Sequence, residues 1–306
     1  MKYLVTGGAG FIGSNIVEEL VKQGQQVAVL DNYATGKRAN LDPFRDQIEV
    51  FEGDIRSPFA VMEAAQGCDF ILHQAALPSV PRSVKDPLTT NEVNVMGTLN
   101  VLKAAINHKV KKVVYASSSS VYGNTETLPK HEEMPTHPLS PYAVSKLAGE
   151  HYCETFSSLY GLPIVAFRYF NVFGPRQDPT SQYSAVIPKF IEAIKHDRRP
   201  TVYGDGSQSR DFCFVQNVVR ANLAACQVDT GKFLVANVAT GNRFSLNEMI
   251  AMLNRILGKD IKPVYDKPRM GDVLHSLASV EILRGRLGVK ELVGLEEGLE
   301  RLCGEC

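Results

Sequence analysis

The sequence predicts an α/β protein with a Rossmann-type, doubly wound parallel sheet and a smaller C-terminal α/β domain. Short apolar segments that fit buried strands alternate with helical segments through the first 170 residues. This alternation is typical of a parallel sheet covered by helices on both faces. A glycine-rich turn follows the first apolar segment, and acids follow the second and third. With 306 residues the chain is long enough for two parts, and we expect a boundary near residue 172.

The first strand-like segment, residues 1–6, runs into a turn rich in glycine, Gly7-Gly8-Ala9-Gly10-Phe11-Ile12-Gly13. An amphipathic helix follows, then a second strand at 26–30 that ends on Asp31. This order of strand, glycine turn, helix, strand and acid is typical of a dinucleotide site. The glycines let backbone amides approach a pyrophosphate, and the helix N-terminus adds partial positive charge. Asp31 would accept hydrogen bonds from ribose hydroxyls and repel a 2′-phosphate, which favours NAD over NADP.

Two later segments add candidates for cofactor contacts. Asp54 follows a third strand at 48–55 and could reach the adenine, although an aspartate before a helix that begins near Ser57 also suits a simple turn. A fourth strand at 69–73 runs into Gln74-Ala75-Ala76. Small residues at this point would let the chain pass close to the cofactor. We therefore assign residues 1–172 to an NAD-binding domain, to which later segments return, and 173–306 mainly to substrate binding.

Tyr142 precedes Lys146 by four residues in a helical segment, so the two side chains share one helix face. An ammonium beside a phenol favours the phenolate and lowers the pKa of the tyrosine from about 10. A tyrosine with a lowered pKa can act as a general acid and base near neutral pH. An isolated pair with this spacing is also compatible with an ordinary surface contact.

A run of four serines, residues 117–120, follows the strand at 112–116. Hydroxyls at the C-terminal edge of a parallel sheet point into the ligand crevice. One of them could hydrogen-bond the substrate hydroxyl that Tyr142 deprotonates, whereas the alternative is a solvated serine-rich loop.

The T-G-G-A-G-F-I-G turn, the S-S-S-S-V-Y-G strand end and the Y-A-V-S-K segment resemble the extended short-chain dehydrogenase/reductase superfamily, and within it the UDP-sugar 4-epimerases. The resemblance covers essentially the whole chain. It implies that Ser118 is the catalytic hydroxyl, Tyr142 the base and Lys146 its partner. The expected cofactor contacts are Gly7, Gly10, Phe11, Ile12, Gly13, Asp31, Asn32, Asp54, Ile55, Gln74, Ala75, Ala76, Asn94, Tyr142, Lys146 and Tyr169.

On the substrate side the resemblance implies that Arg210 and Arg269 clamp a diphosphate, a task that suits the bidentate guanidinium. Asp272 would contact the nucleoside ribose, and Ser276 would limit the pocket near the sugar 2-substituent. The expected substrate-binding residues are Ser118, Asn171, Val186, Tyr203, Arg210, Arg269, Asp272 and Ser276.

The activity implied is a UDP-sugar 4-epimerase with bound NAD and a transient 4-keto sugar. A serine at 276, where a bulky tyrosine can stand in glucose-restricted epimerases, leaves space for an N-acetyl group. We therefore expect UDP-glucose/UDP-galactose and also UDP-N-acetylglucosamine/UDP-N-acetylgalactosamine as substrates, since pocket shape discriminates only gradually.

Three alternatives share parts of the pattern. A sugar-nucleotide 4,6-dehydratase needs an Asp-Glu pair where Ser119 and Ser120 stand, and a UDP-glucuronate decarboxylase usually has a glutamate at the position of Ser120. A non-catalytic NAD-sensing protein of the same fold commonly lacks the Tyr or the Lys, and both are present here.

Composition bears on partners and location. Lysine plus arginine and aspartate plus glutamate are each 33, so neither a basic excess nor a basic cluster points to nucleic acid or a membrane surface. The six cysteines predict reduced core thiols of a cytoplasmic protein. We expect no metal site, and we interpret the terminal C-x-x-C, Cys303 to Cys306, as a frayed tail. The resemblance implies a homodimer through the helices that carry Asn94 and Tyr142.

Overall fold

The computed structural model describes residues 1–178, 186–268 and 274–304. A seven-stranded parallel sheet with the order β11-β6-β5-β4-β1-β2-β3 forms its centre. The strands are β1 (Lys2–Thr6), β2 (Gln26–Asp31), β3 (Ile48–Glu52), β4 (Phe70–His73), β5 (Lys112–Ser118), β6 (Ile164–Tyr169) and β11 (Phe233–Val238).

The strand order reverses between β1 and β4, because the chain builds β1 to β3 in one direction and β4 to β6 in the other. At such a switch point the loops that leave the strands diverge and open a crevice at the carboxyl edge of the sheet. This arrangement confirms the predicted doubly wound α/β fold.

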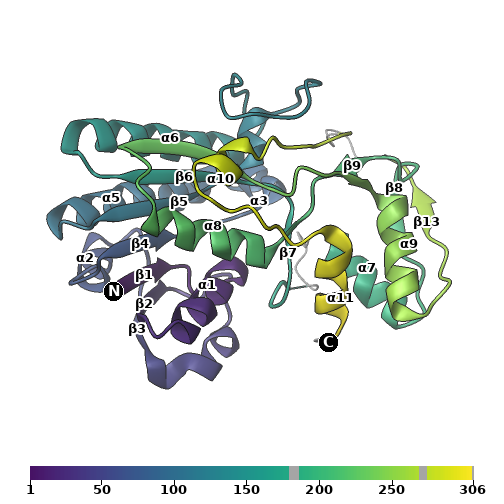
Figure 1. Cartoon of the computed structure of the whole chain (residues 1–306), viewed down its shortest axis with the longest axis horizontal. Helices are drawn as coiled ribbons and strands as arrows, with labels where there is room; N and C mark the ends of the chain where they lie inside the picture. The colour runs from purple at the N-terminus through teal and green to yellow at the C-terminus, as the bar shows by residue number, and fades with distance from the viewer. Residues whose placement is uncertain (179–185, 269–273, 305–306) are drawn as a thin grey trace.

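Helices cover both faces of the sheet, which is why its strands are apolar on both sides. Leu4 and Leu30 pack toward α2, α5 and α6, whereas their neighbours Val5 and Val29 pack toward α1 and α8. Figure 1 shows α5 and α6 side by side over one face of the sheet. The helices of this part are α1 (Phe11–Lys22), α2 (Pro58–Ala64), α3 (Val80–Lys85), α4 (Pro87–Asn91), a π-helical turn (Glu92–Met96), α5 (Gly97–Asn107), α6 (Pro141–Tyr160) and α8 (Val215–Gln227), with 3₁₀ turns at Arg38–Asn40, Asp42–Gln47 and Ser119–Tyr122.

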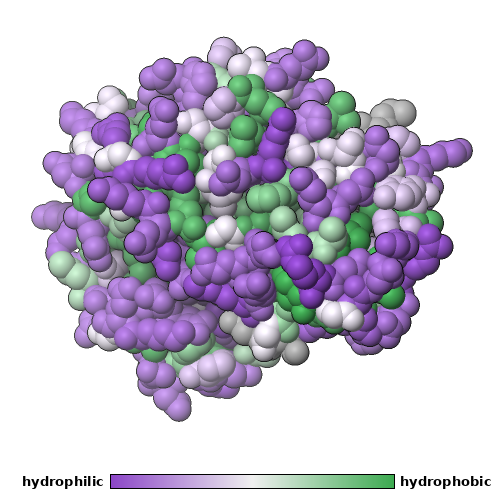
Figure 2. Space-filling model, turned by 45° about the vertical axis from the view of Figure 1, so that its right-hand side comes forward, coloured by the Kyte–Doolittle hydropathy of each residue, from purple (hydrophilic) through white to green (hydrophobic). Residues whose placement is uncertain are grey.

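The second part lies to the right in Figure 1 and has its own apolar core, which includes Phe190, Leu253 and Leu299. Short strand pairs connect it: β10 pairs with β7, β12 with β9 and β13 with β8. Its elements are β7 (Val172–Phe173), α7 (Val186–Lys195), β8 (Thr201–Tyr203), β9 (Ser209–Arg210), β10 (Cys213–Phe214), β12 (Phe244–Ser245), α9 (Leu246–Leu257), β13 (Val264–Asp266) and α11 (Leu295–Gly304), whereas α10 (Glu281–Gly285) packs against β11 of the main sheet. On the face shown in Figure 2, apolar side chains gather near the middle and hydrophilic ones cover most of the periphery.

The chain crosses between the two parts more than once. After β10 it returns through α8, which packs against α1, and through β11, which pairs in parallel with β6. The sheet is therefore completed by residues far beyond 172, while the boundary itself stays a prediction.

Cys68, Cys153, Cys213 and Cys226 are buried free thiols, and Cys303 is partly exposed. Cys306 lies outside the described residues. Within the described ranges no helix is long and apolar enough to cross a membrane.

Candidate active site

The glycine turn brings two stretches of backbone closer together than side chains would permit. Gly7 has φ +69°, and a Cβ there would lie 2.7 Å from the backbone nitrogen of Ala75, just beyond β4. A Cβ on Gly13 would overlap the carbonyl oxygen of Gly7. The turn therefore lies flat across the carboxyl ends of β1 and β4, and α1 begins at Phe11 with its N-terminus at the crevice.

Asp31 at the end of β2 ties the glycine turn to the next loop. Its Oδ2 accepts a hydrogen bond from the backbone N–H of Ala9 at 2.9 Å, and Oδ1 accepts one from Tyr33 at 2.8 Å. Burial raises the pKa of this carboxyl, and the two backbone donors act in the opposite direction. Each carboxylate oxygen still has a lone pair for another donor, such as a ribose hydroxyl.

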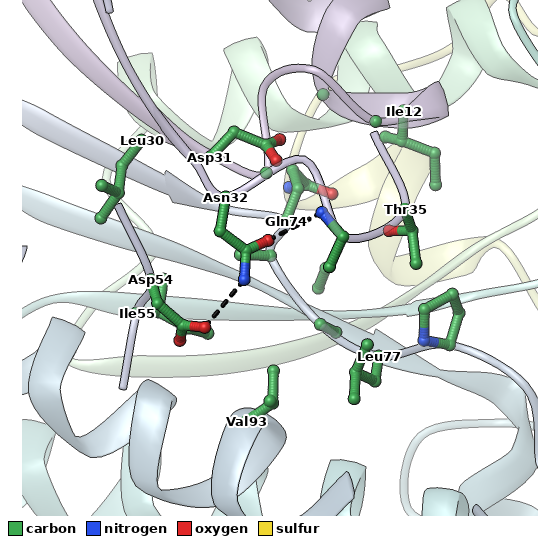
Figure 3. Close-up of a pocket in the computed structure, with 18 of the residues that line it drawn as sticks. Ile12, Leu30, Asp31, Asn32, Thr35, Asp54, Ile55, Gln74, Leu77 and Val93 are labelled. Carbon is green, nitrogen blue, oxygen red and sulfur yellow. Dashed lines mark hydrogen bonds between the residues drawn. The ribbon is translucent and has the colours of Figure 1, made fainter. Parts of the chain in front are cut away.

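Asp54 and Asn32 form the adjoining wall of the crevice, and Figure 3 shows Asn32 between Asp31 and Asp54. Asn32 donates to Asp54 Oδ2 at 2.8 Å, and Arg56 binds the same carboxylate through Nη2 at 2.8 Å and Nε at 3.1 Å. The hydrogen bond from Arg56 lowers the pKa of Asp54. Asp54 also accepts from the backbone N–H of Arg56, so it serves the turn as well as the crevice.

These residues line a cleft of about 360 Å³. The cleft contains every predicted cofactor residue except Asn94. It also contains residues that the sequence analysis missed, namely Leu30, Ala34, Thr35, Gly53, Arg56, Leu77, Pro78, Thr89, Val93, Ala116 and Ser117. Most of these stand beside a predicted residue on a loop, and only loop geometry decides that they face inward.

Asn94 acts from behind the cleft. It is 1% exposed, its Oδ1 accepts from the backbone N–H of Leu77 at 2.8 Å, and its Nδ2 donates to Ser145 Oγ at 3.0 Å. Asn94, an expected cofactor contact, therefore does not line the cleft. Asn94 instead fixes the lining residue Leu77 against the helix α6.

The helix α6 presents Tyr142 and Lys146 to the cleft. Ser140 is its N-cap and accepts from the backbone N–H of Ala143 at 3.2 Å, Pro141 occupies the first turn, and Gly161 ends the helix in the left-handed conformation. These are the residue types that favour a helix start and end. Both functional side chains thus lie in the first two turns, at the carboxyl edge of the sheet.

The side chain of Ser118, the last residue of β5, lies close to Tyr142. Burial raises the pKa of Tyr142, and the interaction with the Ser118 side chain acts against that rise. The sequence-based expectation of a lowered pKa is not met in the protein alone, because Lys146 does not contribute to the shift. Ser118 Oγ also accepts from Ser120 Oγ at 2.9 Å and from Ser120 N–H at 3.2 Å.

The Lys146 ammonium is held by the backbone. It is 4% exposed, and its Nζ donates to the carbonyl oxygen of Ala116 on β5 at 2.7 Å. Burial lowers the pKa of Lys146 to about 8, although Cys153 and Glu150 act in the opposite direction. A lysine with this pKa carries its charge at neutral pH and can donate toward a ligand in the cleft.

A second cleft of about 600 Å³ lies where the chain leaves β6. Tyr169 at the end of β6 lines the first cleft, and Asn171, two residues later, lines the second, so the two clefts adjoin. The second cleft contains the predicted residues Asn171, Val186, Tyr203 and Arg210, together with the unpredicted residues Lys189, Glu192, Arg198, Arg199 and Gln208. Among these unpredicted residues, only the paired arginines at 198–199 form a sequence pattern that could have indicated a binding role.

Asp211, the residue after Arg210, holds together the chain segments beside the second cleft. Asp211 is fully buried, and its carboxylate accepts from Thr240 N–H and Oγ1 at 2.8 Å each, Gly241 N–H at 3.0 Å and Ala278 N–H at 3.3 Å. Burial raises its pKa to about 6, against the pull of these donors. Asp211 joins three distant segments and fixes the backbone that carries Arg210; sequence reasoning missed this role.

Ser276 lies near this anchor, is 7% exposed and donates its backbone N–H to the carbonyl oxygen of Ser209 at 3.0 Å. It does not appear among the residues that line either cleft. Arg269 and Asp272, the predicted second clamp and ribose contact, lie outside the described residues. In the part of the chain that the structure describes, no group of three or more His, Cys, Asp or Glu is arranged to hold a metal ion.

The fold and the site define a Rossmann-type enzyme with a Ser-Tyr-Lys set. Residues 3–239 match the NAD dependent epimerase/dehydratase family. The chain is 38% identical to a putative UDP-glucose 4-epimerase from Methanocaldococcus jannaschii, over 98% of this chain and 96% of that protein. It therefore belongs to the NAD dependent epimerase/dehydratase family.

Solved structures agree with this assignment. A UDP-N-acetylglucosamine 4-epimerase from Methanobrevibacter ruminantium, in complex with UDP-N-acetylmuramic acid, superposes with a TM-score of 0.94 at 39% identity, covering 99% of this chain and 97% of that one. A UDP-glucose 4-epimerase from Thermus thermophilus in complex with NAD gives 0.89 at 38% identity, covering 99% and 98%.

The first cleft fits NAD, the cofactor of the family. The crowded backbone at Gly7 and Gly13 admits no side chain, so the N–H groups at the start of α1 can face a pyrophosphate. Asp31 and Asp54 line one end of the cleft, and Tyr142, Lys146 and Tyr169 line the rest. The adenosine half would therefore lie at the aspartates and the nicotinamide half at α6.

Proposed function

We propose that this protein is a UDP-hexose 4-epimerase. The observation that carries the proposal is that Ser118, Tyr142 and Lys146 lie together, at the point where the dinucleotide cleft adjoins a second cleft that contains Arg210. This juxtaposition supports an acid/base that acts between a nicotinamide and a nucleotide sugar.

In the proposed reaction Tyr142 takes the proton of the sugar 4-hydroxyl and later gives it back. When bound, NAD accepts a hydride from carbon 4 and returns it to the opposite face of the 4-keto sugar. Ser118 holds the reacting oxygen, and the Lys146 ammonium binds the cofactor ribose. The protein supplies position and proton transfer, as enzymes that use a nicotinamide generally do.

The second cleft accepts the nucleoside diphosphate in this proposal. Arg210 binds the diphosphate, and Asn171 contacts it from the end of β6. Val186 and Tyr203 surround the nucleoside. Arg269 and Asp272 stay predictions for the second clamp and the ribose contact. A neutral chain with 33 basic and 33 acidic residues needs such local cations to bind a dianionic substrate.

The hexose specificity is part of the proposal. Ser276 is small, so both plain and N-acetylated hexoses are accepted, and the proximity of Ser276 to Ser209 and Arg210 supports its place beside the sugar. No acid follows Ser118: Ser119 and Ser120 are next in the chain, and Ser120 is engaged with Ser118 itself. This argues against dehydration and decarboxylation.

The homodimer belongs to the proposal as well. Large apolar side chains are exposed along α4, α6 and the π-helical turn: Leu88, Met96, Val144, Tyr152 and Leu159. Because α4 and α6 pack against each other, these side chains belong to one region, and a second copy would cover them. The buried free thiols support a cytoplasmic location.

Product analysis by NMR tests the activity. Purified protein is incubated with UDP-glucose, UDP-N-acetylglucosamine and UDP-glucuronate separately, first without and then with added NAD, and with Tyr142→Phe as the control. Conversion to the 4-epimer by the wild type alone supports the proposal. If no hexose is converted even with NAD, the proposal fails; a pentose product from UDP-glucuronate would indicate the decarboxylase.

A further inference from the structure

The segment after β7, residues 174–178, crosses back to the NAD-binding part, and we call it the strap. It leaves the second part at Phe173 and contacts that earlier part at three places that are distant in sequence: two on α1 and one at residue 37. Within the described residues, the strap contains no side chain to which the proposed mechanism assigns a role.

Two of the contacts are on the face of α1 that continues from Phe11, which lines the NAD cleft. Asn15 donates to the carbonyl oxygen of Pro175 at 3.1 Å and to that of Phe11 at 2.8 Å. One turn further, Glu18 Oε2 pairs with Arg176 Nη2 at 2.6 Å. The strap therefore attaches to the helix whose N-terminus faces the cofactor.

The third contact is on the loop between β2 and the first 3₁₀ turn. Ala34 and Thr35 of this loop line the NAD cleft, and Lys37 donates its backbone N–H to the carbonyl oxygen of Ala9 at 3.0 Å. The Lys37 side chain pairs with Asp178 at 3.0 Å. The strap thereby connects α1 to the loop that contains Ala34 and Thr35.

The strap also contains two buried polar atoms, Arg176 Nε and Gln177 Oε1, that have no hydrogen-bond partner in the part of the chain described. Buried polar groups are nearly always paired.

We infer that the strap is a cofactor-retention device: its contacts with Asn15, Glu18 and Lys37 hold the glycine-turn helix and the 34–37 loop closed around NAD through both half-reactions. The inference rests on the proposed function, because an epimerase uses one cofactor molecule for both the removal and the return of the hydride. An enzyme that releases its cofactor in every cycle would gain nothing from such a device.

The two ion pairs are only partly shielded, with side chains 21% to 56% exposed, so salt weakens them. Raising the ionic strength should therefore increase the dissociation rate of NAD from the wild type. The hydrogen bond from Asn15 is less sensitive to salt and should keep part of the retention.

The test uses Lys37→Met and Glu18→Gln in the full-length protein, with Lys22→Met as the matched control. Lys22 pairs with the other oxygen of Glu18, at 2.7 Å, but does not reach the strap. The readouts are the NAD that co-purifies, the Kd for NAD by calorimetry and the thermal midpoint of the NAD-free protein. We expect each strap variant to raise Kd about two- to fivefold and to lose part of the salt dependence, while Lys22→Met retains wild-type values.

An unchanged Kd in Lys37→Met and Glu18→Gln would overturn the inference, as would an equal rise in Lys22→Met. A lower thermal midpoint of the NAD-free protein with an unchanged Kd would show that the strap only joins the two parts. Because these readouts need no sugar, they separate this inference from the epimerase proposal, which depends on the product analysis alone.

Discussion

Glu150 on α6 and Arg168 on β6 form a buried, two-pronged ion pair, with Arg168 Nη2 at 2.7 Å from Glu150 Oε2 and Nε at 3.0 Å from Oε1. Both side chains are at most 6% exposed. Ser117 Oγ on β5 donates to the same carboxylate. Glu150 stands one helical turn beyond Lys146, so this cluster fixes the catalytic helix relative to the two strands that carry Ser118 and Tyr169.

Breaking this pair from one side should destabilise the protein strongly. Arg168→Met leaves the Glu150 carboxylate buried without its partner, which typically costs about 3 to 5 kcal/mol of unfolding free energy. Urea unfolding followed by circular dichroism measures the loss. The exposed pair between Arg38 and Glu52 provides the control: Arg38→Met should have a far smaller effect, and equal effects would contradict the role assigned to burial.

Tyr142→Phe should abolish proton transfer and leave the clefts intact. Loss of a general acid/base lowers kcat by about 10² to 10⁴, whereas the Kd for NAD and for UDP should stay close to the wild-type values. Ser118→Ala should lower kcat less, since the tyrosine hydroxyl remains. Steady-state kinetics and calorimetry together check this; a variant that loses NAD binding as severely as turnover would contradict it.

Ser276→Tyr should reduce activity on N-acetylated hexoses selectively. The added ring occupies the space that we assign to the acetamido group, so kcat/KM for UDP-N-acetylglucosamine should fall at least about tenfold relative to that for UDP-glucose. Ser276→Ala, which keeps the position small, serves as the control and should retain both activities. Equal losses on the two substrates in Ser276→Tyr would refute the assignment.

Lys146 should make unfolding depend on pH in the alkaline range. Its pKa is about 8 in the folded protein against 10.5 for the free side chain, so between these values the unfolded chain binds more protons and the unfolding free energy rises with pH. This difference amounts to about 3 kcal/mol at most. In Lys146→Met the rise between pH 8 and 10.5 should be smaller by that amount, whereas the exposed-site variant Lys103→Met should follow the wild type.

The sequence predicts the central sheet well, and its predicted cofactor residues other than Asn94 line one cleft, because both features follow from local patterns. The glycine turn with Asp31 belongs to one short strand-turn-helix-strand unit, and the Tyr142–Lys146 spacing belongs to one helix. Both patterns can therefore be recognised in a short stretch of sequence. The capping box at Ser245 and Glu248, which opens α9, is likewise a local feature.

The features that sequence reasoning missed depend on contacts between distant segments. Glu150 meets Ser117 and Arg168 only because β5 and β6 pair with Ser117 opposite Arg168. Asp211 likewise collects Thr240, Gly241 and Ala278 from loops that are unrelated in sequence. The pKa of Tyr142 was predicted in the wrong direction for the protein alone, because helical spacing does not report burial.

The position of β11 at the edge of the main sheet affects how the chain folds during synthesis and how chimeras with its relatives can be built. During synthesis, β6 has no neighbour on its outer side until residue 238 has left the ribosome, because β11 is the strand that pairs there. The nucleotide-binding half therefore cannot finish folding before much of the other half exists. A chimera that borrows its sugar specificity from a relative must exchange two separate segments, one before α8 and one after β11, and keep the native chain between them.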